Sequence, residues 1–273
     1  MANLNWRAKW IWCQGEERPK NFYLYVRKGF SLKSAVRAAN IRITADSRYQ
    51  LFVNGTLVAR GPARCDRRWQ YYDEWDIASH LSIGANVIAA LAHHYGEWTF
   101  SYMLGRGAFL AEVDIEGANN ERVLLQTDET WHVLPAEAWQ RDLPRMSIQL
   151  GYPEVYEARK EVEGWNAADF DDSDWQRAKV LGPPGIEPWP NLVPRDIPPM
   201  METHLQAEKV IDLGEVEKVR VGYYVDLLRV IWNPDNAVAY LAAFVWSPSD
   251  GNFEIHAVSQ EGIKLWLNGE LVI

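Results

Sequence analysis

The sequence predicts an all-β protein built around an antiparallel β-sandwich or jelly roll. Between residues 21 and 180, β-branched and aromatic residues come in short runs separated by turn signals, with no long stretch of 3.6-residue period. A strand, an Asn-Gly pair and a second strand also occur twice, at residues 49–58 and 263–272. Because Asn-Gly tolerates positive φ at both centres of a type I′ turn, each copy predicts a tight hairpin.

Apolar runs bounded by Gly, Pro, Asn or Asp predict the strands of the first sandwich. Strands this short and this closely spaced favour antiparallel pairing, since parallel strands need long crossover connections. The strands expected here are residues 22–30, 41–45, 49–53, 56–60, 70–75, 86–92, 108–115, 122–127 and 131–134.

Proline content marks the end of this unit. Residues 181–200 contain seven of the 14 prolines in the chain, and proline fixes φ and lacks an N–H donor. We therefore predict an N-terminal sandwich over residues 1–180, an extended proline-rich connector over 181–205, and a second β-sandwich unit from 206 to 273. The last unit is expected to be incomplete, and the chain to be the front part of a longer protein, because a terminal hairpin is marginal by itself. Its expected strands are residues 209–213, 219–231, 238–246, 253–258 and 263–267.

Composition excludes several classes of partner. The chain has 273 residues, of which 48% are hydrophobic, and a formal net charge of -9. It has no basic stripe, so nucleic acid and membrane partners are not expected. The N-terminal residues lack the apolar core of a signal peptide, which predicts a cytoplasmic protein unless a leader was removed. Cys13 and Cys65 are too few for a disulfide framework or a paired zinc site.

The sequence contains none of the common signatures of a self-contained catalytic centre. A nucleophile elbow, a phosphate-binding loop and His-Glu-x-x-His are all missing, and we predict no catalytic residue. Acidic residues are neighbours at 73–76 and 171–174, but adjacent residues of a strand point to opposite faces. The second run is expected to cap a turn before Trp175, with a calcium site as the alternative.

Aromatic and polar residues after the apolar strand 87–91 are the candidates for binding. This segment should lie at a sheet end, where binding loops gather, and aromatic rings pack against the C–H faces of sugars. The alternative is a cluster that closes the core, as many of the 14 tryptophans must do. The candidate carbohydrate-binding residues are His93, His94, Glu97 and Trp98 of this segment, together with Trp69 and Tyr72 of a second aromatic-rich region.

Several blocks of the chain together carry a family resemblance. They are residues 45–55 (ADSRYQLFVNG), 60–64 (RGPAR), 69–73 (WQYYD) and 81–89 (LSIGANVIA). In this order they resemble the N-terminal region of bacterial α-L-rhamnosidases, glycoside hydrolase family 78. Residues 164–166 (GWN), 170–175 (FDDSDW) and 194–199 (PRDIPP) look like the stretches that lead to the next domain of that family. The likeness extends from about residue 8 to residue 200.

The resemblance implies a non-catalytic, jelly-roll or galactose-binding-like sandwich attached to an inverting glycosidase that removes terminal α-L-rhamnose. In that family the acid and base carboxylates belong to a downstream (α/α)6 barrel, so no catalytic residue is transferred to this chain. The expected function is an accessory portion of a rhamnosidase-like hydrolase that supports the downstream catalytic domain of the same parent chain and contacts carbohydrate. A stand-alone carbohydrate-binding module and a structural or assembly domain are the alternatives. Some members bind rhamnose with calcium on an accessory sandwich, but no residue here is matched to that motif.

Overall fold

The computed structural model describes residues 6–201, 206, 209, 238–244, 246, 250, 255, 257–259 and 262–273. The chain divides into two units, Met1–Tyr224 and Val225–Ile273, which are described separately. In the described ranges every helical segment is a single 3₁₀ turn and the remaining regular structure is β-strand, which confirms the predicted all-β class. No helix in these ranges is long and apolar enough to cross a membrane.

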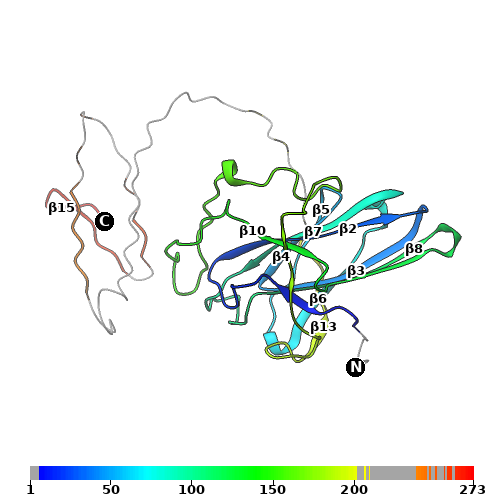
Figure 1. The fold of residues 1–273 in the computed structure, drawn as a ribbon. Helices are drawn as coiled ribbons and strands as arrows, with labels where there is room; N and C mark the ends of the chain where they lie inside the picture. Colours follow the sequence, from blue (N-terminus) through cyan, green and yellow to red (C-terminus); the bar gives the residue numbers. More distant parts are fainter. Residues whose placement is uncertain are drawn as a thin grey trace. The chain divides into compact units, whose positions relative to one another are not determined.

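The first unit is a sandwich of two sheets (Figure 1). All strands pair antiparallel except for one pair, β6 (Gln70–Asp76) and β13 (Leu192–Pro194), which is parallel. The first sheet runs, in order of pairing, through β12 (Lys179–Gly182), β1 (Trp10–Trp12), β8 (Ala108–Gly117), β3 (Val36–Asp46), β6 (Gln70–Asp76) and β13 (Leu192–Pro194), with β9 (Arg122–Gln126) beside β8. The second runs through β11 (Gln176–Arg177), β10 (His132–Pro135), β2 (Phe22–Leu32), β7 (Gly84–His94), β4 (Arg48–Val53) and β5 (Thr56–Gly61).

The main core lies between the sheets and follows from the alternation of side chains along each strand. Leu24 and Val26 of β2 face Ile41 and Ile43 of β3, and all four are completely buried in one cluster with Phe109 of β8. Fully burying an aliphatic side chain of this size contributes roughly 1.5–3 kcal/mol. Together these inward-facing residues hold the two layers together.

Two further clusters cover the outer faces of the sheets. Val87 and Ala89 of β7 pack with Trp165 and Trp175, which belong to the long segment after β10. The middle of strand β7 is thus buried on both faces, which explains why residues 87–92 are all apolar instead of alternating. On the other sheet Trp10 stacks on Trp189, with ring centroids 4.2 Å apart. A large share of the tryptophan content is therefore core.

The proline-rich segment predicted to be a connector is extended, but part of it is docked on the sandwich. Strand β13 pairs in parallel with β6 at the edge of the sheet, and the Trp189 side chain is completely buried. An edge strand suits proline because its outward N–H groups need no partner. The predicted domain boundaries at residues 180 and 205 stay predictions.

In the second unit the predicted hairpin is present, as β14 (Trp266–Leu267) and β15 (Glu270–Leu271). The strands predicted at 209–213 and 219–231 lie outside the described residues, apart from Lys209. The described residues within 238–246 and 253–258 carry no strand, so those two predictions are not met there. A strand requires a hydrogen-bonded neighbour, and no described residue supplies one to them.

Replacing Gly55 by alanine is expected to destabilise the first unit by about 1 kcal/mol. Gly55 has φ of +83°, and a Cβ added there meets no atom within 4 Å. The loss of stability in Gly55→Ala therefore reports backbone strain alone. Gly29→Ala is the matched control, because Gly29 is equally open and has no positive φ. Urea unfolding followed by tryptophan fluorescence measures both. Equal effects of the two substitutions would contradict the type I′ turn.

Candidate functional site

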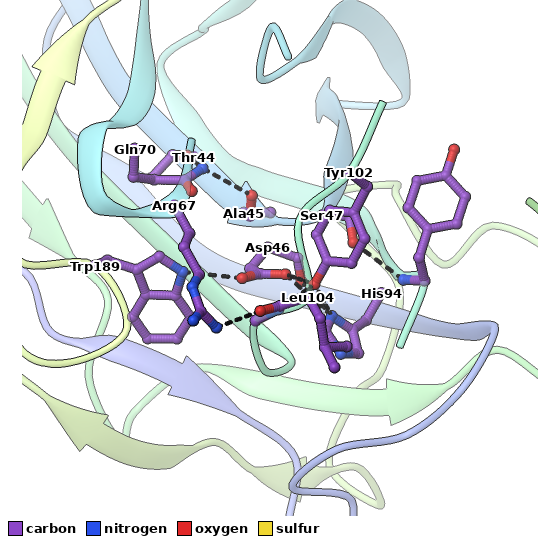
Figure 2. Close-up of polar contacts among 12 residues, drawn as sticks. Thr44, Ala45, Asp46, Ser47, Arg67, Gln70, His94, Tyr102, Leu104 and Trp189 are labelled. Atoms are coloured by element: carbon purple, nitrogen blue, oxygen red, sulfur yellow. Dashed lines mark hydrogen bonds and ion pairs between the residues drawn. The ribbon is translucent and has the colours of Figure 1, made fainter. Parts of the chain in front are cut away.

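Three loops meet at one end of the sandwich, which we call the loop end. They are the turn between β3 and β4, the segment 62–69 between β5 and β6, and the segment 95–107 between β7 and β8. Ser47 Oγ accepts a hydrogen bond of 3.0 Å from the Tyr95 N–H, and Arg67 donates to the carbonyl oxygen of Leu104. Figure 2 shows these contacts around Asp46. The polar contacts fix the loops relative to one another.

The carboxylate of Asp46 is the centre of this network. Asp46 is 3% exposed. The Tyr102 hydroxyl donates to its Oδ1, and the Trp189 indole N–H donates to its Oδ2 over 2.9 Å. His94 Nδ1 lies 3.1 Å from the Asp46 carbonyl oxygen and 3.2 Å from Oδ1. Since both are acceptors, Nδ1 carries a hydrogen. Asp46 thus ties β3, β7 and the segment after β12 together.

The environment of Tyr102 keeps its hydroxyl protonated. Burial raises the pKa of Tyr102 far above its ordinary value, and the neighbouring negative charge of Asp46 raises it further. The hydroxyl therefore remains a donor to Asp46 and also accepts the Gly105 N–H over 2.9 Å. This carboxylate is fully engaged in internal bonds, which is the arrangement of a structural group.

A second buried carboxylate lies beside a small cleft. The cleft has a volume of about 190 Å³ and is bordered by Trp75 and Ile197. Asp73 is 2% exposed, accepts the hydroxyl of Tyr49 and lies 2.5 Å from Arg195 Nε. Burial raises the pKa of Asp73, while Tyr49 and Arg195 oppose that rise.

The acidic runs do not form converging carboxylate pairs. On β6, Asp73 is buried and the next residue, Glu74, is exposed, as strand alternation requires. In the second run the Ser173 N–H donates to Asp171 Oδ1 over 3.0 Å, which confirms the predicted capping of a turn. Asp172 instead forms an ion pair with Arg27 and lies 2.8 Å from His132 Nδ1. Within the described part of the chain no group of three or more His, Cys, Asp or Glu side chains could hold a metal ion.

The two adjacent histidines lie inside the strand and not in the loop after it. Strand β7 extends through His94, whose side chain is completely buried. His93 stacks on Tyr23 with ring centroids 3.9 Å apart, and its Nε2 lies 3.1 Å from Asn21 Oδ1. Burial lowers the pKa of His93 to about 3, with smaller contributions from Arg48 and His94. His93 is therefore neutral near pH 7.

The remaining candidates divide between the surface and the interior. Trp98 and Trp69 are exposed at the loop end, with 53% and 48% of their surface accessible. Glu97 forms an ion pair with Lys20. Tyr72 is buried and packs edge-on against Trp6 at 5.1 Å. His94 and Tyr72 thus offer no surface to a ligand, and sugar binding by the exposed candidates stays a prediction.

The structure adds an exposed ring that the sequence reasoning missed. Phe100 is 70% exposed, and the Arg64 guanidinium lies 4.9 Å from its ring centroid. Arg145 donates to the carbonyl oxygens of Trp98 and Leu150, over 2.5 and 3.1 Å, and so fixes the neighbouring loops. We call Trp69, Trp98 and Phe100 the aromatic rim. The sequence signal that could have identified Phe100 is the spacing W-x-F, in which Phe100 follows Trp98 by two residues after the end of a strand.

The family of the chain follows from a match that covers the sandwich from β3 onward. The model of the α-L-rhamnosidase N-terminal domain matches residues 34–204. The chain belongs to this family. An α-L-rhamnosidase of Streptomyces avermitilis is 27% identical over 208 residues, which are 70% of this chain and 18% of that protein. The chain thus spans about a fifth of the length of the curated rhamnosidases it matches.

Solved rhamnosidases share the fold of this N-terminal domain. The glycoside hydrolase family 78 rhamnosidase of Bacillus sp. GL1 superimposes with a TM-score of 0.67 at 43% identity, over 72% of this chain and 20% of that one. The α-L-rhamnosidase of Dictyoglumus thermophilum gives 0.59 at 23% identity, over 73% and 23% of the two chains, and shows the fold alone. The resemblance stated from the sequence blocks is therefore confirmed.

Proposed function

We propose that this chain is a non-catalytic accessory portion of an α-L-rhamnosidase, which supports a catalytic domain located elsewhere in the parent protein. The observation that carries the proposal is the engagement of Asp46 and Asp73, each enclosed by donors from its own domain. Glycoside hydrolysis needs two carboxyl groups that flank one glycosidic bond, roughly 5–10 Å apart. A buried carboxylate whose oxygens are engaged by internal hydrogen bonds or an ion pair is unavailable for that task.

Incubation of the chain with an aryl α-L-rhamnoside is expected to release no phenol above the buffer blank. The reason is that neither buried carboxylate reaches a bound glycosidic oxygen. Asp73→Asn and Glu74→Gln serve as paired variants in the same assay. Activity that persists through purification and is lost in one of these variants would overturn the accessory role.

We further propose that the aromatic rim contacts carbohydrate. Aromatic rings bind the C–H faces of pyranoses while polar neighbours orient the hydroxyl groups. The rim offers Trp69, Trp98 and Phe100 on loops at a sheet end, with Glu97 and Arg64 next to them in the same loops. The same rings could instead dock a protein domain, and the following experiment separates the two.

Calorimetric titration with L-rhamnose, with and without calcium, is expected to give saturable binding that Trp98→Ala weakens about ten-fold or more. Trp266→Ala is the matched control, because Trp266 is 50% exposed and lies in the other unit. Absence of binding at tens of millimolar sugar would reject carbohydrate contact and favour the scaffold role. Equal loss in both variants would reject the aromatic rim as the binding surface.

A further inference from the structure

A second pocket lies on the six-stranded sheet, where β2, β10 and β11 are neighbours. It has a volume of about 230 Å³, and we call it the basic pocket. Its charged lining residues are Arg27, Lys28, His132, Asp172 and Arg177. Three of these are permanent or nearly permanent cations and one is a carboxylate, in a chain whose formal net charge is -9. The lining itself is therefore net positive, while Asp128 and Asp171 act on Lys28 and Arg27 from outside it.

Strand register explains why these side chains converge. His132 of β10 is paired with Arg27 of β2 on one side and with Arg177 of β11 on the other. Directly paired residues of antiparallel strands point to the same face of a sheet. The three basic side chains therefore form a row across the sheet. Lys28, the next residue of β2, starts from the opposite face, and its long side chain reaches the carbonyl oxygen of Thr130 and lines the same pocket.

The carboxylate of the pocket is already occupied. Asp172 Oδ2 lies 3.2 Å from Arg27 Nε, and its Oδ1 lies 2.8 Å from His132 Nδ1. The Arg27 side chain is 2% exposed and also donates to the carbonyl oxygens of Phe170 and Ala167, over 3.1 and 3.2 Å. Arg27 and Asp172 thus form a neutral, internally bonded pair that fixes the wall of the pocket.

Lys28 and Arg177 remain as two positive groups without a lining carboxylate of their own. Both donate to the carbonyl oxygen of Thr130, over 3.3 and 2.9 Å. Burial lowers the pKa of Lys28, and the charge of Arg177 lowers it too, while Asp128 opposes the shift. Asp128 itself accepts the Thr130 N–H and hydroxyl, over 2.8 and 2.5 Å. Two like charges that share one carbonyl acceptor favour an anion between them.

We propose that the basic pocket binds a tetrahedral oxyanion, a sulfate or phosphate group. Arg177 offers a planar fork of N–H donors of which one is used on Thr130, and a guanidinium binds oxyanions in bidentate fashion. Lys28 contributes a point charge, whereas the Nδ1 of His132 is already used on Asp172. The pocket is open to solvent and admits the group either as a free ion or as part of a sulfated or phosphorylated sugar.

The test is a calorimetric titration with sodium sulfate and sodium phosphate at constant ionic strength set by sodium chloride. We expect saturable one-site binding that Arg177→Gln weakens about ten-fold or more, since a charge-assisted bidentate contact is lost. Arg122→Gln is the matched control, because Arg122 is also exposed and paired with a strand neighbour, Asp114, but lies outside the pocket. Unchanged binding in that control supports the site.

Folding and the source of the anion are checked in the same series. Circular dichroism establishes that each variant is folded, and Lys28→Gln replaces Arg177→Gln if the latter is not. A monosaccharide sulfate that binds several-fold tighter than inorganic sulfate supports a sugar-borne group, whereas equal affinity supports a free ion at the same site. Binding that does not saturate, or that Arg122→Gln weakens as much as Arg177→Gln does, would overturn the proposal.

Discussion

Replacing Asp46 by alanine is expected to destabilise the first unit by about 3–5 kcal/mol. The substitution leaves the Tyr102 hydroxyl and the Trp189 indole N–H without their acceptor in a buried site, whereas His94 keeps the backbone carbonyl oxygen of residue 46. Buried donors that lose their partner keep the full cost of desolvation. The midpoint and slope of urea unfolding, followed by tryptophan fluorescence, give the change in free energy.

The matched control for Asp46→Ala is Asp114→Ala. Asp114 lies on β8 and pairs with Arg122 at the surface, with 42% of its side chain exposed. A pair of this kind contributes at most about 1 kcal/mol. A loss below 1 kcal/mol for Asp46→Ala, or a loss as large for Asp114→Ala, would show that the Asp46 network does not hold the loop end together.

Replacing Arg195 by methionine is expected to cost about 3–5 kcal/mol at pH 7. The Arg195 side chain is 11% exposed, and its removal leaves the buried carboxylate of Asp73 without its positive partner. The Tyr49 hydroxyl still donates to Asp73, so one bond survives. Because this ion pair joins the proline-rich segment to β6, proteolysis after residue 182 should also accelerate.

The cost of Arg195→Met should depend on pH in a defined direction. Burial already raises the pKa of Asp73 in the folded protein, and loss of Arg195 removes a cause that lowers it. The folded state then holds a proton more tightly than the unfolded state, so stability falls as pH rises above the unfolded pKa of about 3.9. Unfolding at pH 4.5 should show a smaller cost than at pH 7. Asp73→Asn in the same background should restore most of the loss, and a pH-independent cost would refute the ion-pair explanation.

Local signals were sufficient to predict much of the sandwich. Asn-Gly dictated both hairpins, with φ of 48° at Asn54 and 51° at Asn268, because few other pairs tolerate positive φ at two successive positions. The docking of the proline-rich segment was not predictable in the same way. Proline specifies an extended backbone, but the partner of Trp189 is Trp10, which lies 179 residues earlier in the chain. No local pattern encodes such a contact.

The binding candidates show where strand boundaries limit inference. We expected the strand to end at residue 92, which placed both histidines in a loop. Strand β7 in fact stays paired with β2 as far as His94, which lies opposite Phe22. Because side chains alternate between the two faces of a strand, His94 points into the core. The basic pocket was hidden for a related reason, because Arg27, His132 and Arg177 come together only through the pairing of three strands.

The parallel strand at the sheet margin has a consequence for the behaviour of the protein in concentrated solution. A bare margin is a template on which strands of other molecules can add. Strand β13 is only three residues long and ends at Pro194, so it shields the peptide groups of β6 and offers few N–H donors of its own. The proline-rich segment, which the sequence suggests is only a spacer, therefore disfavours the addition of strands from other molecules at this edge.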